Sequence, residues 1–495
     1  MSEPENLTPS DLDRRWINAG WLAIVFLFFA SFAFGLLKVF PGYVHWDTGE
    51  AFLWSTLGFK FEYVKHPPLL AWVIGVFDIF LPMNWVTLTG IAALNLTIGA
   101  LAIWRASLLV LDPARGFAAL FLYCLSPYHV WHAMKFDHNA ILISTWSFLV
   151  WAFLCTLRRP NVLSGLWLGL AAALTVYAKF QSIIILSVLG MICLFTSSGR
   201  ALLKRSSPYL SLVVFLAFIA PLYFHSESVI GYATGYSDPV TFPIQYFEVS
   251  LARQSAILLM AGLFLFLYGR DDSFPLETKK ILALLSLLPF ALTFLMTILV
   301  DLRGSQAWMA PAFVTLPIFL TSFVSPRGLQ RQNHLKPILY SIFCGLIFGG
   351  FLSSYYAFRF QLKNEIEPRI EVINEAADLW TKVSGNPVAL IAGDMPLSVA
   401  ATLELKHHPK SWAYFDPGFW WVSPKDIEEK GMLAFCRSHD ASCLNHAQKF
   451  LTQQGGFQCV LEAQRERFGL ASPLLQVSVF FIPPLGKSFQ QICKK

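Results

Sequence analysis

The chain has 495 residues, of which 55% are hydrophobic, 15% aromatic and only 14% charged, and its mean hydropathy is +0.54. This composition excludes a soluble globule and is typical of a protein that crosses a membrane several times. The net charge of +6 does not point to nucleic acid, because basic residues of membrane proteins gather in cytoplasmic loops.

Apolar runs of about 17 to 25 residues mark candidate membrane spans, and the sequence contains about eleven of them, a few of them shorter than this. They cover residues 16–37, 85–111, 117–131, 140–157, 163–177, 183–195, 209–224, 256–268, 281–300, 307–323 and 337–351. The first run follows Arg14 and Arg15, and residues 31–33 (Ser-Phe-Ala) resemble a signal-peptide cleavage site. The apolar run continues past this site to Phe40. We therefore expect an uncleaved anchor, with a cleaved signal peptide as the alternative.

Alternate connections between the spans differ in charge. One set is rich in basic residues, so we expect it to be cytoplasmic; its members are Arg14, Arg15, Arg115, Arg158, Arg159, Arg200, Lys204, Arg205, Arg270, Lys279, Lys280, Arg327, Arg331 and Lys336. The opposite set holds most of the acids near the membrane and should be extracytoplasmic; it comprises residues 43–70, 134–139, 177–182, 226–254 and 301–308. An odd number of spans with the N-terminus inside places everything after about residue 355 outside as well.

The last part of the chain has a different character. Charges become frequent, and the apolar runs shrink to strand length, as in "NPVALIAGD" and "LLQVSVFFIPP". We predict a transmembrane domain over residues 1–354 and a small extracytoplasmic α/β domain over residues 355–495. Four of the eight cysteines, Cys436, Cys443, Cys459 and Cys493, lie in this second part. One or two disulfides are expected there, and the sequence leaves their pairing open.

The first external loop, residues 40–84, concentrates charge between apolar runs. In "DTGEAFLWSTLG" Asp47 stands at a predicted helix N-cap with Glu50 three residues on, which predicts a short amphipathic helix at the membrane surface. "KHPPLLAWVIGVFDIFLP" then begins with Lys65 and His66 and continues into an apolar run too short to span comfortably. Two such helices would form a shelf that suits a substrate with a lipid tail and a charged head.

The stretch "WDTGEAFLWSTLGFKFEYVKHPPLLAWVIGVF" resembles the first external loop of GT-C membrane glycosyltransferases. The similarity is to the branch of dolichyl-phosphate-mannose protein mannosyltransferases and of lipid A aminoarabinose and galacturonic acid transferases. "LSPYHVWHAMKFDHNAILIS" resembles the second acidic loop, with Asp137 at the motif aspartate, and "LTVYAKFQSIII" resembles the segment with a loop lysine, at Lys179. "GSQAWMAPAFVTLPIFL" resembles a later span start. The resemblance covers roughly residues 15–325.

This sequence departs from the branch at two places. The usual Asp-Glu pair is opened to Asp47-Thr48-Gly49-Glu50, which puts any catalytic share of Glu50 in doubt. His66 follows Lys65 where a lysine often precedes the proline, so that either cation could face a phosphate.

The resemblance implies a polytopic α-helical GT-C protein with about 11 transmembrane helices, set in the inner membrane with its active site toward the periplasm. It also implies transfer of a sugar, with inversion, from a polyprenyl-phosphate donor to an acceptor, here lipopolysaccharide core or lipid A. Such a reaction needs a base for the acceptor hydroxyl and cations for the leaving phosphate. We expect Asp47 to be the base, with Glu50 and Asp137 as further catalytic candidates. The donor phosphate would be held by Lys65, His66, Lys179 and Arg303.

Each of these residues also has a structural alternative. The alternatives are a helix cap for Asp47, a capping or solvated residue for Glu50, a local ion pair beside Lys135 and His138 for Asp137, snorkelling to the interface for Lys179, and a pair with Asp301 for Arg303. Tyr236, Asp238, Gln245 and Glu248 stand in a long outside loop, and their spacing fixes no role.

Two other functions fit the composition. A protein O-glycosyltransferase of the same fold would share every motif. A secondary transporter should show repeat-related halves and polar residues near mid-membrane, whereas here the ionisable residues gather at the ends of spans. We expect membrane lipid but no nucleic acid as a partner, no cofactor and no obligatory metal, with a carboxylate-bound divalent ion as the alternative.

Overall fold

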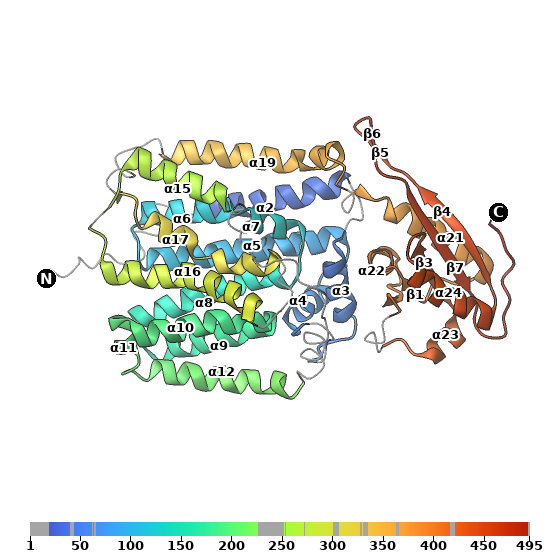
Figure 1. Ribbon diagram of the computed structural model, residues 1–495, viewed down its shortest axis with the longest axis horizontal. Helices are drawn as coiled ribbons and strands as arrows, with labels where there is room; N and C mark the ends of the chain where they lie inside the picture. The colour runs from blue at the N-terminus through green and yellow to red at the C-terminus, as the bar shows by residue number, and fades with distance from the viewer. Residues whose placement is uncertain are drawn as a thin grey trace. The chain divides into compact units, whose positions relative to one another are not determined.

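The computed structural model describes residues 19–39, 44–61, 63, 66–225, 252, 254–271, 273–299, 306–326, 329, 335–362, 366–415 and 421–493. The chain divides into two compact units (Figure 1). Unit 1 comprises residues 1–32, 60–70 and 90–348, and unit 2 comprises residues 33–59, 71–89 and 349–495. Four helices contribute residues to both units; these are α2 (Ala19–Val39), α4 (Leu69–Asp78), α5 (Trp85–Leu108) and α19 (Leu335–Arg359).

Unit 1 is helical. Its other helices are α6 (Pro113–Cys124), α7 (Pro127–Met134), α8 (His138–Arg158), α9 (Val162–Ala178), α10 (Ile183–Phe195), α11 (Ser197–Leu202), α12 (Ser207–Phe224), α15 (Ser255–Tyr268), α16 (Leu276–Leu299) and α17 (Leu316–Thr321), with 3-10 turns η1 (Phe180–Ser182) and η2 (Gln306–Phe313).

Among the described residues five helices are long and apolar enough to cross a membrane. They cover Trp85–Leu108, His138–Arg158, Ser207–Phe224, Leu276–Met296 and Ile342–Arg359, and six shorter apolar helices accompany them. The chain is thus a polytopic helical membrane protein, as its composition predicts. The count of about eleven spans stays a prediction.

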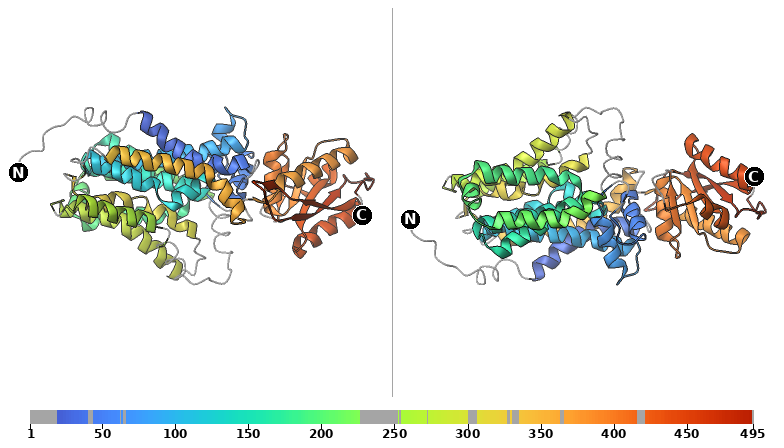
Figure 2. Two further views of the ribbon diagram at one scale, coloured as in Figure 1. Left: turned by 90° about the horizontal axis from the view of Figure 1, so that it is seen from above. Right: turned by 90° about the horizontal axis from the view of Figure 1, so that it is seen from below.

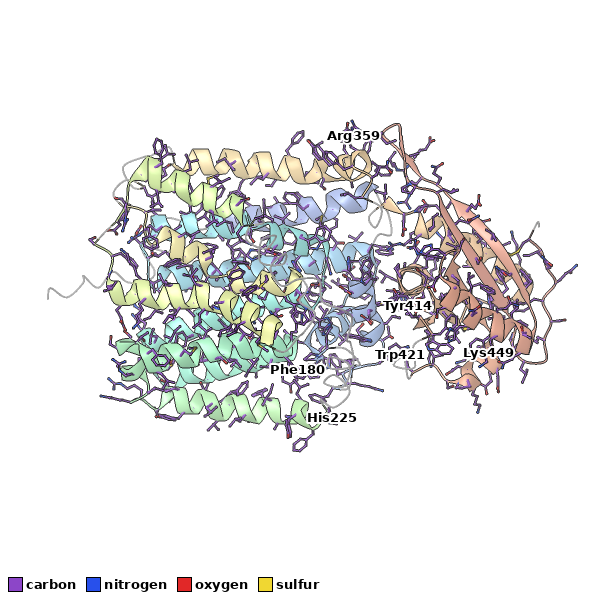
Figure 3. All side chains as sticks on the ribbon, in the orientation of Figure 1. Phe180, His225, Arg359, Tyr414, Trp421 and Lys449 are labelled. Atoms are coloured by element: carbon purple, nitrogen blue, oxygen red, sulfur yellow. A yellow bond between two sulfur atoms is a disulfide. The ribbon has the colours of Figure 1, made fainter. Side chains whose placement is uncertain are left out.

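Helices α9 and α12 pack closely through two glycines spaced as in a G-x-x-x-G motif. A β-carbon on Gly165 would lie 2.7 Å from the carbonyl oxygen of Ser207, and one on Gly169 would lie 2.5 Å from that of Ser211. Small residues at this spacing let the backbones of membrane helices approach each other. The two helices run in the same direction, and Figure 3 shows Phe180 and His225, which follow them, at the same end of unit 1.

The basic connections of unit 1 meet at its other end. Arg115 binds the carboxylate of Asp112, which caps α6, and donates to Asp271 Oδ2 at 2.9 Å. Arg158 donates to the carbonyl oxygen of Leu109 at 2.7 Å. These connections therefore share one end of the unit, in agreement with the charge pattern, which predicts all of them to be cytoplasmic. The side of the membrane itself stays a prediction.

Unit 2 contains a five-stranded mixed sheet in the order β2-β1-β3-β7-β4. Its strands are β1 (Leu390–Gly393), β2 (Lys410–Ala413), β3 (Met432–Arg437), β4 (Phe457–Ala463) and β7 (Leu475–Ile482). β1 pairs parallel with β2 and β3, and β7 pairs antiparallel with β3 and β4. The runs "NPVALIAGD" and "LLQVSVFFIPP" form β1 and β7, so these two strand predictions are confirmed. The domain boundary and its side of the membrane stay predictions.

Four helices accompany this sheet: α21 (Arg369–Ser384), α22 (Met395–Glu404), α23 (Pro424–Lys430) and α24 (Ala441–Gln454) (Figure 2). We call residues 366–493 the α/β part. Side chains from α23 and α24 build a core with one face of the sheet, in which Ala392, Ala434 and Phe480 are buried. Every residue of β1 is buried, so both of its faces are covered. Disulfides Cys436–Cys443 and Cys459–Cys493 tie β3 to α24 and β4 to the end of the chain, which confirms that disulfides form here.

Candidate active site

Asp137 begins helix α8 and is buried, with 2% of its surface exposed. "KFD" joins α7 to α8, and Asp137 takes the N-cap position, where its Oδ1 accepts from the backbone N–H of Ala140 at 2.8 Å. An aspartate at an N-cap satisfies one of the unpaired N–H groups of the first turn. Capping uses only part of the carboxylate, which leaves oxygens for other partners.

Two basic side chains of the α7–α8 segment face this carboxylate. Lys135 Nζ lies 3.1 Å from Asp137 Oδ2, and His132 Nε2 lies 3.6 Å from Oδ1. His132 Nδ1 is 2.6 Å from the carbonyl oxygen of Tyr128 and must donate to it, because a carbonyl oxygen only accepts. A second proton on this imidazole would therefore sit at Nε2, facing Asp137. The predicted ion pair of Asp137 with Lys135 is present.

Lys179 reaches the same carboxylate through an amide. The lysine follows α9, and its Nζ donates to Asn139 Oδ1 at 2.8 Å, while Asn139 Nδ2 donates to Asp137 Oδ2 at 3.2 Å. The ammonium group also lies 4.9 Å from the ring centroid of Trp308. Only 8% of Lys179 is exposed, so snorkelling into solvent does not describe it. We call His132, Lys135, Asp137, Asn139, Lys179 and Trp308 the Asp137 cluster.

His66 lies beside this cluster. Its ring centroid is 4.1 Å from that of His138, the residue after Asp137. Phe61, from the same loop, stacks on His225 at the end of α12 with 5.6 Å between centroids. The structure thus brings His66, Asp137 and Lys179 to one end of unit 1, although 113 residues separate His66 from Lys179 (179 − 66) in the sequence.

Asp47 is not the cap of its helix, which corrects the sequence-based expectation. Helix α3 (Trp46–Ser55) is capped by His45, whose Nδ1 accepts from the backbone N–H of Asp47 at 3.3 Å. Asp47 lies in the first turn, where a negative charge favours the helix dipole. Its carboxylate Oδ2 is 3.6 Å from His45 Nδ1, and a third of its side chain is exposed.

Glu50 is 4% exposed, so it is not a solvated residue. The expected amphipathic surface helix is also wrong, because Thr48 through Ser55 are all buried. One face of α3 packs against α22. A β-carbon on Gly49 would overlap Cγ1 of Val399 in α22, and Phe52 meets His408 at 5.2 Å between ring centroids. The second helix of the loop, α4 (Leu69–Asp78), has ten residues and is too short to span, as expected.

The remaining sequence-based candidates lie outside the described residues. These are Lys65, Arg303 and the loop residues Tyr236, Asp238, Gln245 and Glu248. Sequence reasoning assigned no role to His132, Asn139 and Trp308. Each stands inside a stretch that carries the family resemblance, so the signal was present, but only the fold turns these neighbours toward Asp137 and Lys179. Among the described residues no group of three or more side chains could hold a metal ion.

Residues 65–225 match the model of the dolichyl-phosphate-mannose-protein mannosyltransferase family. No curated protein matches the chain by sequence. Among solved structures, ArnT from Cupriavidus metallidurans bound to undecaprenyl phosphate superposes with a TM-score of 0.59 at 13% identity, over 93% of this chain and 98% of that one. The same protein in the apo state gives a TM-score of 0.58 at 13% identity with the same coverage.

The chain has the ArnT fold. The predicted resemblance to the mannosyltransferase and ArnT branch is therefore confirmed. The family match spans about a third of the chain and includes His66, Asp137 and Lys179. The matched segment thus contains most of the polar side chains at this end of unit 1.

Proposed function

We propose that the protein is a glycosyltransferase that moves a sugar, with inversion, from a polyprenyl-phosphate donor to an acceptor hydroxyl at the periplasmic face of the inner membrane. The observation that carries the proposal is the Asp137 cluster with His66 beside it. It places a lysine and a histidine, both able to bind phosphate, at the end of a membrane bundle. The matching ArnT structure contains undecaprenyl phosphate, a ligand of the class that such an end would bind.

At the anomeric carbon the reaction forms one bond and breaks one, and a proton transfer from the acceptor accompanies this exchange. The acceptor oxygen attacks the anomeric carbon from the face opposite the phosphate, and the bond between that carbon and the phosphate oxygen breaks. The phosphate leaves with the electron pair, and the acceptor proton passes to a carboxylate, which we assign to Asp47. Positive charge near the leaving oxygens stabilises the transition state without a proton transfer.

Lys179 is the group we assign to the leaving phosphate, with His66 as its partner. An amide oxygen and the face of Trp308 hold the ammonium group in place, and neither group removes its charge. Asp137 is a positioning residue in this scheme, because its carboxylate accepts from Asn139, the amide that holds the Lys179 ammonium group. The buried setting strengthens charge interactions compared with water.

The acceptor we propose is lipopolysaccharide core or lipid A. The test is mass spectrometry of envelope glycolipids from cells with and without the gene, followed by transfer from undecaprenyl-phosphate sugar by the purified protein. A sugar missing from lipopolysaccharide in the deletion strain is expected. A sugar missing from proteins instead would identify a protein O-glycosyltransferase, and solute uptake by vesicles without donor consumption would identify a transporter.

A further inference from the structure

A short hairpin projects from the α/β part and exposes an aromatic ring at its tip. Strands β5 (Glu466–Arg467) and β6 (Leu470–Ala471) pair antiparallel, and Phe468 in the turn is 58% exposed. Phe468 has a φ of 57°, a conformation that costs a bulky residue about 1–3 kcal/mol. More than half of this apolar side chain therefore stays uncovered, in a turn conformation that is costly for phenylalanine.

The base of the hairpin is firmly held. Arg465 donates twice to the carboxylate of Glu371 in α21, at 2.7 Å for both contacts. Arg465 and Ser472 bind each other across the base, and Gln361 Nε2 donates to the carbonyl oxygen of Ala471 at 3.1 Å. Because Gln361 is the second residue after α19, this contact fixes the hairpin at the end of that helix.

Helix α19 sets the depth of the hairpin tip. Its segment Ile342–Arg359 is one of the candidate membrane spans, and Tyr355 and Tyr356 stand near its end, where tyrosines gather at membrane–water interfaces. Phe468 meets Tyr355 and Phe358 at 5.9 Å and 6.3 Å between ring centroids. Arg359 and the hairpin lie side by side at this end of α19 (Figures 1 and 3). The tip therefore lies at the C-terminal end of this candidate span.

We propose that the β5–β6 hairpin is a membrane anchor that inserts Phe468 into the lipid interface beside the end of α19. The exposed apolar side chains that form this surface are Tyr355, Tyr356, Phe360, Leu362 and Phe468. Arg359 and Arg467 are exposed at the same place and suit the phosphates of anionic lipids. Transfer of the phenyl ring from water into the lipid interface is favourable, and this gain offsets the strain of the turn.

The test places an environment-sensitive fluorophore at residue 468. Phe468→Cys is labelled in a background with Cys124, Cys155, Cys193 and Cys344 replaced by alanine, and the protein is reconstituted into phosphatidylethanolamine–phosphatidylglycerol vesicles. Val460→Cys is the matched control, because Val460 is 55% exposed on β4 of the same sheet. Blue-shifted emission that shallow doxyl lipids quench and aqueous iodide does not is expected at 468 only.

Two outcomes overturn the proposal. Iodide quenching at 468 equal to that at 460 would place the tip in water. Blue-shifted emission that neither quencher reduces would mean that another part of the chain covers the ring. A label-free check uses Phe468→Gly, which suits the left-handed turn and should fold. It should increase trypsin cleavage after Arg467 in vesicles, and unchanged cleavage contradicts anchoring.

Discussion

Gly49 of α3 lies against Val399 of α22 so closely that a β-carbon on Gly49 would overlap Val399 Cγ1. This contact joins the first external loop to the α/β part, although 350 residues separate the two positions (399 − 49). Trp85 Nε1 adds a hydrogen bond to Glu404 Oε2 at 2.7 Å, from the other end of the same loop. Both contacts bear on α22 and hold the loop that carries Asp47. With Val399 opposite, the glycine within Asp47-Thr48-Gly49-Glu50 has a structural reason, because a β-carbon at residue 49 would overlap that side chain.

Gly49→Ala should destabilise the protein by about 1–3 kcal/mol through overpacking, and sugar transfer should fall with it. Valine is stiff in a helix and cannot swing away, so relief requires a smaller side chain at residue 399. Val399→Ala in the same chain should recover most of the thermal stability and activity lost by Gly49→Ala. Gly90→Ala is the control, because a β-carbon on Gly90 meets nothing within 4 Å. Additive losses in the double variant would show that the two residues do not share this contact.

A second prediction concerns acid stability of the α/β part. Arg437 donates to both oxygens of Glu367, at 2.8 Å and 2.9 Å, and its Nε donates to Asp394 at 2.8 Å. Burial alone would raise the pKa of Glu367, but the hydrogen bonds and charges of Arg437 and Arg369 outweigh burial and bring it below the ordinary 4.5. Because the pKa is lower in the folded state, the stabilisation that ionised Glu367 contributes is fully present above pH 4.5. It is lost as the pH falls through the folded-state pKa of Glu367.

Glu367→Gln should therefore lower the thermal unfolding temperature at pH 7, by the equivalent of about 1–3 kcal/mol. The difference from wild type should shrink as the pH falls below about 4.5. Unfolding curves of the detergent-solubilised protein between pH 3 and 8 measure this, with Glu429→Gln as control because the side chain of Glu429 is 58% exposed. A gap between Glu367→Gln and wild type that stays constant with pH would contradict the assignment.

The parts of this protein that follow from local pattern could be predicted. β1 and β7 are short apolar runs bounded by turn residues, and α4 is an apolar run of ten residues that ends too soon to span. Asp137, Lys179 and His66 were expected together because the charge sorting put their loops on one side of the membrane and the family motifs occur in the same order. Such features depend on hydrophobic period, length and charge, which a sequence displays directly.

The features that the sequence did not disclose depend on tertiary contact. His45 caps α3 because its imidazole accepts from the backbone N–H of Asp47 in the first turn. Histidine is not among the residues that usually cap helices. Thr48 to Ser55 of α3 are buried by tertiary packing, to which α22 contributes one face. Asn139 bridges Lys179 and Asp137 because α8 and α9 pack side by side. For α3 and Asn139 the deciding partner is distant in the sequence, and for the cap the residue is of a type that helix capping does not usually favour.

Lys179→Ala should reduce kcat/KM for the polyprenyl-phosphate donor about ten- to a hundredfold. Loss of one charge-assisted contact to a phosphate costs about 1.5–3 kcal/mol. His66→Ala should act in the same direction. Lys425→Ala is the control, since the side chain of Lys425 is 79% exposed. Steady-state transfer and thermal unfolding are measured on the same samples. Wild-type kinetics in both variants, with normal stability, would remove the phosphate assignment.

Asp47→Asn tests the proposed base. Because His45 rather than Asp47 caps α3, the substitution leaves the cap intact and removes only the charge and the proton acceptor. Folding should survive with a change of a few tenths of a kcal/mol to about 1 kcal/mol from the helix dipole. Turnover should fall about 10²–10⁴-fold, the usual contribution of a general base.

His45→Ala is the matched control for Asp47→Asn. Removing the cap should lower stability by about 0.5–2 kcal/mol, yet the Asp47 carboxylate remains, so the loss of turnover should be far smaller than in Asp47→Asn. Both variants are compared by sugar transfer from undecaprenyl-phosphate sugar and by thermal unfolding. If Asp47→Asn retains activity within about threefold of wild type, far less than a general base contributes, Asp47 is not the base. Asp137, whose carboxylate is bound by Lys135 and by Asn139, then becomes the residue to test.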